Sequence, residues 1–188
     1  MPRRITWEGV ALLLVLAGGL LASSCSDDSA PRSVVTIESI NANESLDSDV
    51  YNNGDDGEPG TSDDLIYEDQ VPIVLRNRPH DSALDLTSAG AFGAVVFDHY
   101  EVTFQGEEAL PTVSGAMYLK VAAGATVTGE VTIVPVAYKI VPPLSTLRQG
   151  GEILLNSQIT LYGEEQDSGQ EVVAKGVLPV HCANWGDE

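Results

Sequence analysis

The strongest constraint on the fold of this chain is a two-residue alternation of apolar and polar side chains, which recurs in segment after segment. In residues 71–75, 153–162 and 172–182 most of the alternate positions form one apolar face, with Val, Ile and Leu as its usual members. Successive side chains of a strand point to opposite faces, so this period indicates strands with one buried face. Gly, Pro, Asn and Asp separate most of the segments, which is typical of turns between antiparallel strands.

Seven such segments span the chain, and no stretch has convincing helical periodicity. They cover residues 34–37, 71–75, 95–104, 117–121, 126–141, 153–162 and 172–182. We therefore predict an all-β fold, an antiparallel β-sandwich of about seven strands. The strand number and spacing resemble those of immunoglobulin and fibronectin type III domains, although the Cys…Trp…Cys signature of antibody domains is missing. An open barrel is the main alternative.

A long acidic loop is predicted after the first strand, over residues 41–64. Between Ser33 and Leu75 there are eleven acidic residues and no Lys or Arg. Ca²⁺ takes about six to eight oxygen ligands, which a Gly-rich Asp/Asn loop can supply. The loop is therefore a candidate calcium site, although it does not keep the EF-hand spacing, and a solvated loop without metal is the alternative. The candidate metal ligands are Asp47, Asp49, Asn53, Asp55, Asp56, Glu58, Asp63 and Asp64.

The first 24 residues have the layout of a secretory signal peptide. Two arginines, at positions 3 and 4, precede an apolar run of twelve residues over 10–21. A helix that spans a membrane needs about 20 residues, so the run suits a signal peptide better than a permanent span. It is followed by Ala22-Ser23-Ser24-Cys25, which resembles the lipobox of bacterial lipoproteins. The family prefers Leu at the position of Ala22.

This resemblance implies that residues 1–24 are removed and that the Cys25 thiol is acylated. Residues 25–33 would then form a lipid-anchored tether to a single domain over 34–188, held at an outer membrane or cell surface rather than an inner membrane. The alternative is ordinary signal cleavage, which would release a soluble protein. In that case Cys25 and Cys182, the two cysteines of the chain, could form a disulfide in the oxidising exported compartment.

The charge balance limits the kinds of partner. With 28 acidic and 9 basic residues the net charge is −19, which argues against nucleic acid and against direct binding to anionic lipid, because both require clustered Lys and Arg. Contact with a membrane is expected through the lipid anchor alone. The partners that remain are cations, a basic surface, an envelope protein or a glycan.

Residues with reactive side chains do not form a catalytic pattern. Cys182 continues the apolar face of the last segment, so we predict a small buried thiol. His80, His99 and His181 are scattered, and the common hydrolase, phosphate-loop and dinucleotide motifs are absent from the sequence. Tyr67, Tyr118, Tyr138, Tyr162 and Trp185 could pack in the core or form a sugar-stacking platform.

The sequence therefore predicts a membrane-anchored bacterial lipoprotein with a non-enzymatic β-sandwich, acting as a binding or structural module of the cell envelope. Two alternatives remain open. One is an adhesion or interaction module stabilised by Ca²⁺. The other is an envelope hydrolase or a sugar-binding accessory domain.

Overall fold

The structure is a computed structural model that describes residues 31–55, 57, 61, 64–80, 93–106 and 108–185. One compact unit covers Pro31–Glu188. The expected signal peptide, Cys25 and the candidate ligands Asp56, Glu58 and Asp63 lie outside the described residues. Among the helices of the described part, none combines the length and apolarity that crossing a bilayer requires.

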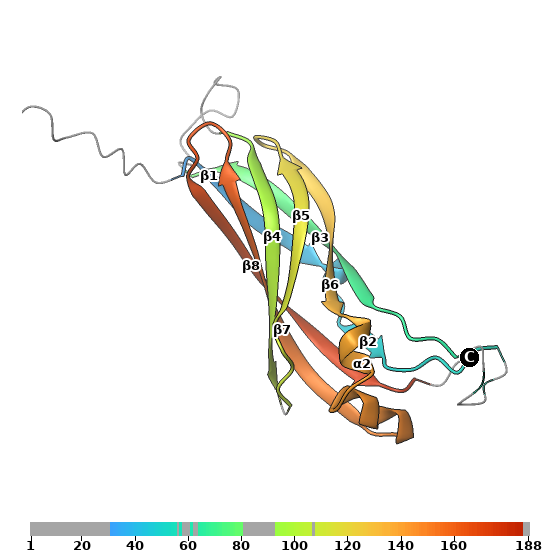
Figure 1. Ribbon diagram of the computed structural model, residues 1–188. Helices are drawn as coiled ribbons and strands as arrows, with labels where there is room; N and C mark the ends of the chain where they lie inside the picture. Colours follow the sequence, from blue (N-terminus) through green and yellow to red (C-terminus); the bar gives the residue numbers. More distant parts are fainter. Residues whose placement is uncertain are drawn as a thin grey trace, which may run out of the picture. The chain divides into compact units, whose positions relative to one another are not determined.

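The compact unit consists of two β-sheets around one apolar core, which confirms the all-β prediction (Figure 1). The three-stranded sheet has the order β1-β3-β6, and the five-stranded sheet has the order β2-β8-β7-β4-β5. The strands are β1 (Ser33–Ile40), β2 (Leu46–Asp49), β3 (Asp69–Pro79), β4 (Val95–Gly106), β5 (Val113–Val121), β6 (Thr126–Val134), β7 (Glu152–Glu165) and β8 (Glu171–Ala183). Each of the seven predicted segments overlaps one strand, and β2 is an eighth.

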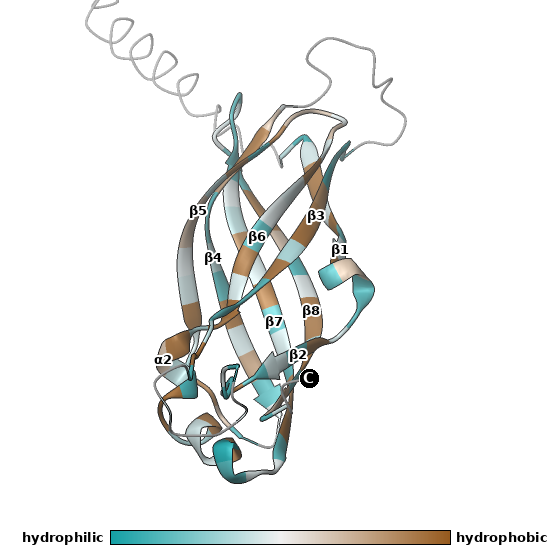
Figure 2. Ribbon diagram, turned by 90° about the vertical axis from the view of Figure 1, so that its right-hand side faces the viewer, coloured by the Kyte–Doolittle hydropathy of each residue, from teal (hydrophilic) through white to brown (hydrophobic). Residues whose placement is uncertain are grey.

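The core follows from the two-residue alternation. In β3 the side chains of Val71, Ile73 and Leu75 are buried, and in β8 every second residue from Val172 to Cys182 points inward except at Gly176. Figure 2 shows apolar and polar residues alternating along the strands of both sheets. The buried face of each sheet packs against the other, so one continuous core lies between them.

A β-bulge in β4 changes which alternate residues are buried, from the odd-numbered residues before it to the even-numbered residues after it. Val95 and Phe97 are buried, and after the irregularity between Phe97 and His99 the buried residues are Tyr100 and Val102. Gly163 of β7 lies opposite Phe97. A Cβ at Gly163 would press on the Val96 carbonyl oxygen and lie 2.9 Å from the Cα of Phe97, so the close approach of β4 and β7 requires glycine here.

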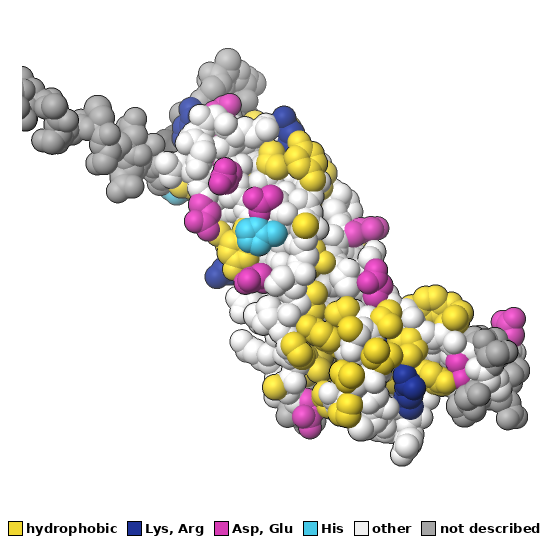
Figure 3. Space-filling model, in the orientation of Figure 1, with side chains coloured by type: hydrophobic (Ala, Val, Ile, Leu, Met, Phe, Trp, Pro, Cys, Tyr) yellow, Lys and Arg dark blue, Asp and Glu magenta, His cyan; other side chains and the backbone are white. Residues whose placement is uncertain are grey.

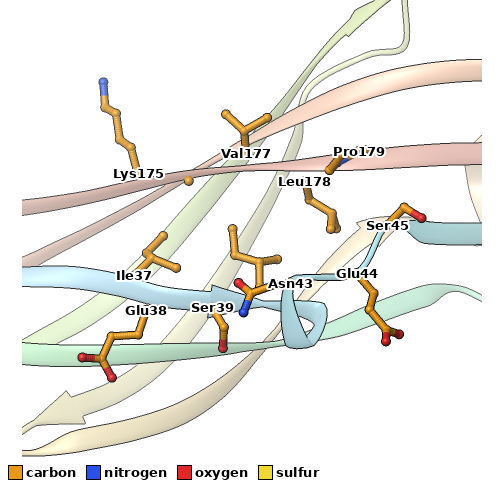
Figure 4. A pocket seen from close by; sticks show the side chains of 12 residues that line it. Ile37, Glu38, Ser39, Asn43, Glu44, Ser45, Lys175, Val177, Leu178 and Pro179 are labelled. Carbon is orange, nitrogen blue, oxygen red and sulfur yellow. The ribbon is translucent and has the colours of Figure 1, made fainter.

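The two sheets meet along a seam between β1 and β8, which lie side by side. The side chains of Ile37 and Ile40 lean over β8 at Gly176, where a Cβ would lie 2.6 Å from the Cδ1 of Ile40. A shallow groove of about 330 Å³ runs along this seam (Figure 4). The glycine thus lets isoleucines from the three-stranded sheet close the edge of the core.

The predicted loop over residues 41–64 is only partly a loop. A short 3-10 helix, η1 (Asn41–Asn43), turns the chain away from the first sheet, and β2 then joins the second sheet by pairing with β8. This pairing is parallel, so the prediction of a wholly antiparallel sandwich is wrong at this edge. Leu46-Asp47-Ser48-Asp49 forms a strand because β8 supplies hydrogen bonds and buries Ser48, although the segment itself is polar.

The predicted strand over residues 126–141 is too long. β6 ends at Val134, and after Pro135 the chain forms a short helix, α2 (Val136–Lys139), followed by a 3-10 helix, η2 (Leu144–Gln149). Proline lacks an amide hydrogen and so cannot continue the β ladder, but it is well tolerated at a helix start. The β-branched composition of Val136-Ala137-Tyr138-Lys139-Ile140-Val141 therefore predicted the wrong element.

The long strands give the unit two distinct ends (Figure 1). The proximal end is where the chain enters at Ser33 and where the β7–β8 turn lies. The distal end contains β2, α2 and η2, together with the end of β8.

Candidate functional site

The distal end is the candidate functional site, because the predicted acidic loop begins there and several unusual side chains meet there. β2 pairs with the last residues of β8, with Asp47 opposite His181 and Ser48 opposite Cys182. His181 Nε2 lies 2.8 Å from Glu152 Oε2, and His181 Nδ1 lies 4.0 Å from Asp47 Oδ1. The Trp185 ring meets the His181 ring edge-on, 4.6 Å between centroids.

Beneath this surface lies a buried polar cluster. Lys139 of α2 is 1% exposed, and its Nζ donates to Asp69 Oδ2 at 2.8 Å and to the Asp49 carbonyl oxygen at 2.6 Å. The Ser48 hydroxyl donates to the same Asp69 oxygen at 2.6 Å. Burying an ammonium is costly unless it is paired and hydrogen-bonded. The cluster therefore fixes α2, β2 and the start of β3 relative to one another.

Cys182 borders this cluster and is fully buried, which confirms the prediction of a buried thiol. Burial raises its pKa to about 11, and a hydrogen bond with Ser48 opposes that shift only in part. Because the thiolate is the reactive form of cysteine, Cys182 is a core residue rather than a nucleophile.

The base of the acidic loop is closed by backbone pairing. Asn52 and Leu65 form an antiparallel bridge with two hydrogen bonds of 3.0 Å, so the two ends of the segment between them lie next to each other. Just before the bridge, Tyr51 lies under the Arg148 guanidinium, 4.5 Å from its ring centroid, and donates its hydroxyl hydrogen to Asp64. The loop is therefore anchored to η2.

The structure describes five of the eight candidate metal ligands and does not bring them to one point. Asp47 lies beside His181, Asp49 accepts from the amides of Tyr51 and Trp185, and Asp64 contacts Tyr51 and Thr61. Asn53 and Asp55 lie just past the bridge, half-buried and exposed respectively. Within the described residues no three His, Cys, Asp or Glu side chains are grouped to hold a metal ion. The calcium site stays a prediction.

One flank of the distal end is apolar. Val136, Ile140 and Val141 are 37%, 53% and 48% exposed, and Pro142 beside them is exposed too. The Tyr138 hydroxyl donates to the Thr112 carbonyl oxygen at 3.1 Å, which joins α2 to the loop between β4 and β5. Figure 3 shows apolar side chains gathered over this part of the surface, with the carboxylates mostly elsewhere on that face.

The outer face of the five-stranded sheet carries a second group of polar and aromatic side chains. The rings of His99 and Tyr162 stack at 4.7 Å and 7°, and His99 also contacts Asp98. The Tyr162 hydroxyl donates to Glu101 at 3.1 Å, and this hydrogen bond, with smaller effects of burial and nearby carboxylates, raises the pKa of Tyr162. Tyr118 stands nearby beside Asp98 and is 78% exposed.

The predicted aromatic and histidine candidates are therefore dispersed. Tyr118 and Tyr162 share the outer sheet face, whereas Tyr67, Tyr138 and Trp185 lie toward the distal end. A hollow of about 310 Å³ adjoins His99, and one of about 300 Å³ adjoins His181. His80 is exposed at the end of β3.

Sequence reasoning did not identify two buried charges, Lys139 at the distal end and Glu165 at the proximal end. The sequence does contain an indication of the buried Lys139, because it is the only charged residue in the apolar stretch 131–147. A lone charge in such a stretch can indicate a buried, paired group. The sequence contains no such indication for Glu165, because this residue adjoins Glu164 at the end of an otherwise ordinary strand.

Comparisons with known proteins give little further information. No protein-family model and no curated protein match the chain. Among solved structures, it resembles the solution structure of a late embryogenesis abundant (LEA) protein, at 13% identity and a TM-score of 0.37. That similarity covers 92% of this chain and 83% of the other. At this level the similarity identifies no family.

Proposed function

We propose that this chain is a bacterial lipoprotein, anchored through Cys25, whose β domain is a non-enzymatic binding or structural module of the cell envelope. The observation that carries the proposal is the signal-peptide layout of residues 1–24, which ends at Ala22-Ser23-Ser24-Cys25. Only five residues, 26–30, separate Cys25 from the compact unit that begins at Pro31. At roughly 3.3 Å per residue this link reaches about 20 Å, so the proximal end would stay near the membrane.

The arrangement of the domain supports this orientation. The chain enters at the proximal end, and the base of the acidic loop, the apolar flank and Trp185 lie at the distal end. A domain held by its proximal end would present those groups away from the bilayer, where a protein or a glycan can reach them.

The test is the mass and partitioning of the chain expressed in a bacterium. The wild-type protein should lose residues 1–24, gain the mass of the acyl groups and partition into detergent. The Cys25→Ser variant should gain no acyl mass and should not partition into detergent. The control variant Cys182→Ala, which lacks the buried thiol, should keep the lipid. A wild-type protein that is processed at the same site without added lipid would refute the anchor.

We also propose that the domain is an immunoglobulin-like sandwich. The support is the strand order, with β1-β3-β6 in one sheet and β8-β7-β4-β5 in the other. If β1 and β2 are two halves of one first strand that changes sheet at η1, seven strands remain, as in immunoglobulin-like domains. An experimental structure in which β1 and β2 both pair with the same sheet would contradict this assignment.

A second candidate function is a module stabilised by Ca²⁺. The observation in its favour is the Asn52–Leu65 bridge, which holds together the ends of a segment with five acidic residues, Asp55, Asp56, Glu58, Asp63 and Asp64. Bound Ca²⁺ would offset their mutual repulsion. The test is the melting temperature in millimolar Ca²⁺ against chelator, with Asp55→Asn as a variant and Glu171→Gln as a control outside the loop. An unchanged melting temperature would count against the site.

A sugar-binding role has the outer sheet face in its favour. The stacked His99 and Tyr162 rings, with Tyr118 and several carboxylates beside them, offer flat apolar surface and hydrogen-bond acceptors together. Glycan binding that is lost in Tyr162→Ala and kept in Tyr67→Ala would support this role. Equal binding by both variants would exclude this face as the site.

A further inference from the structure

The turn that follows the Asn52–Leu65 bridge contains the only Asn-Gly pair of the chain, Asn53-Gly54. Both residues are half-buried, and the next residue, Asp55, is exposed, so water reaches the turn. An asparagine side chain and the backbone nitrogen of the following residue can close a five-membered ring. A following glycine favours this ring closure, because it has no side chain to obstruct its nitrogen and its backbone is conformationally free.

The other six asparagines of the chain are poorer candidates for the same reaction. Each is followed by a residue larger than glycine. Asn77 and Asn156 also lie within β3 and β7, where pairing with neighbouring strands fixes the backbone. The reaction is therefore expected at Asn53 first.

Hydrogen bonds hold the reacting nitrogen in one orientation. Gly54 has a φ of 71°, in the left-handed region that favours glycine. Its amide donates to Asn52 Oδ1 at 2.9 Å, and the Asn52 backbone is itself fixed by its two hydrogen bonds to Leu65. The Gly54 N–H must leave Asn52 Oδ1 before the nitrogen can lose its proton. The Asn52 side chain should therefore slow ring closure without preventing it.

We propose that Asn53 is a site of spontaneous deamidation and that Asn52 restrains its rate. The Gly54 nitrogen loses its proton to water or hydroxide and attacks Cγ of Asn53. A C–N bond forms and closes a succinimide, while the bond between Cγ and Nδ2 breaks and ammonia leaves. Water then opens the ring at either carbonyl, which leaves aspartate or isoaspartate at position 53. One water is consumed and one ammonia is released, with no oxidant or reductant.

The product adds a carboxylate to a segment that is already acidic. Between Asn52 and Leu65 there are five acidic residues and no Lys or Arg, and deamidation supplies a sixth negative charge. The charge of the ligands tunes the affinity of a Ca²⁺ site, and Asn53 is one of the candidate ligands. The modified chain would therefore bind Ca²⁺ more tightly. This consequence rests on the proposed calcium module, whereas the modification itself does not.

The first test follows the full chain by peptide mapping and mass spectrometry during several days at mildly alkaline pH. The peptide that contains Asn53 should gain about one mass unit and take up oxygen from isotope-labelled water. Asn53→Gln is the control, because a glutamine must close a six-membered ring and should react at least tenfold more slowly. A folded chain that stays unmodified while a free peptide of the same sequence reacts would overturn the proposal, as would earlier deamidation at another asparagine.

A second pair of variants tests the role of Asn52. Asn52→Ala removes the acceptor of the Gly54 N–H and keeps the backbone pairing with Leu65, so deamidation of Asn53 should become several-fold faster. Asn52→Asp keeps an acceptor oxygen and should stay as slow as the wild type. If Asn52→Ala reacts no faster than Asn52→Asp, the restraining role of Asn52 is refuted.

Thermal melting in Ca²⁺ and in chelator separates the modification from the calcium module. The rise in melting temperature with Ca²⁺ should be larger for Asn53→Asp than for freshly prepared wild type. If Ca²⁺ shifts neither protein while Asn53 deamidates, the calcium module fails and the modification stands. If Ca²⁺ stabilises the wild type while Asn53 stays intact, the modification fails and the calcium module stands.

Discussion

Glu165 is fully buried at the proximal end, where it ties the two sheets together. Its Oε1 accepts from the Ser33 hydroxyl at 2.6 Å and from the Gly93 amide at 3.1 Å, and its Oε2 accepts from Ser168. Burial by itself would raise the pKa of this carboxyl. The hydrogen bonds from Ser168, Ser33, Gly93 and Arg32 outweigh that effect and lower the pKa below 4.5. The ionised form therefore stabilises the fold.

We predict that Glu165→Gln lowers the free energy of unfolding by about 1–3 kcal/mol at pH 7, because an amide cannot accept all of these hydrogen bonds. Since the folded-state pKa is lowered, the stabilisation is complete above about pH 5 and is lost as pH falls through the folded-state pKa. The free energies of unfolding of the two proteins, measured in urea, should therefore converge as the pH is lowered below the ordinary range of a glutamate carboxyl. The control is Glu164→Gln, which changes the exposed neighbour. A difference in the free energy of unfolding between the wild type and Glu165→Gln that grows in acid would contradict the prediction.

At the distal end the corresponding ion pair joins the buried Lys139 to Asp69, whose side chain is 15% exposed. Lys139→Met leaves the Asp69 carboxylate without its cation and should destabilise the fold by about 3–5 kcal/mol. Asp69→Asn added to that variant removes the unpaired charge and keeps an acceptor for Ser48, so it should recover part of the loss. A double-mutant cycle in urea measures the coupling. Additive losses would mean that the ion pair does not hold the distal end together.

The residues that sequence reasoning placed correctly are those whose environment follows from their own strand. Cys182 was predicted to be buried because it continues the apolar face of β8. The burial of Glu165 depends on Ser33, which is 132 positions away along the chain. The burial of Lys139 depends on Asp69 and on the Asp49 carbonyl. Pairings over such separations are set by the tertiary fold, so the local sequence does not identify the partner, even at Lys139, where a lone charge in an apolar stretch indicates a paired group.

At the scale of strands and helices, the alternation predicted seven strands but not all of their faces and ends. In β4, one residue at the bulge exchanges the buried and exposed sets, so a strict alternation over 95–104 assigns half of the strand to the wrong face. β2 has no apolar pattern and exists because β8 offers a free edge. α2 has strand-forming residues and is a helix because Pro135 ends the ladder and Lys139 reaches Asp69.

The bulge gives a prediction about glycines inside strands. Gly163→Ala should destabilise the fold by about 2–3 kcal/mol, because the new methyl group meets the backbone of Val96 and Phe97, which cannot move without breaking the β4–β7 ladder. Gly176→Ala is the matched variant in β8. There the methyl group meets the ends of the Ile37 and Ile40 side chains, which can rotate away. The melting temperature of Gly163→Ala should be well below that of Gly176→Ala. The reverse order would contradict the close approach of β4 and β7.

For the whole molecule, the unequal distribution of charge matters more than its total. The segment Ala109–Gly151 has a small positive balance, and the rest of the chain carries the acidic excess. The residues of the apolar flank lie within the neutral segment. Composition alone predicted an acidic protein with acidic loops. The near neutrality of this segment can be read from the sequence, but the fold decides which parts of it meet, as where the Tyr138 hydroxyl joins α2 to the loop before β5.

This charge distribution predicts how stability responds to salt. A net charge of −19 destabilises the compact state by self-repulsion, and salt screens it, with a Debye length that falls from about 30 Å at 0.01 M to about 10 Å at 0.1 M. We expect the melting temperature to rise by about 2–4 °C over this range, which corresponds to about 1 kcal/mol for a domain of this size.

Comparing Na⁺ and Ca²⁺ at equal ionic strength separates general screening from a bound metal ion. Screening alone gives similar rises for both salts, whereas a site in the loop beyond Asn52 gives an additional rise with Ca²⁺ that Asp55→Asn reduces. A melting temperature that stays constant or falls as Na⁺ is added would mean that the acidic side chains are too far apart to repel one another in the folded state. Their neutralisation, by metal or by a basic partner, would then contribute nothing to the stability of the domain.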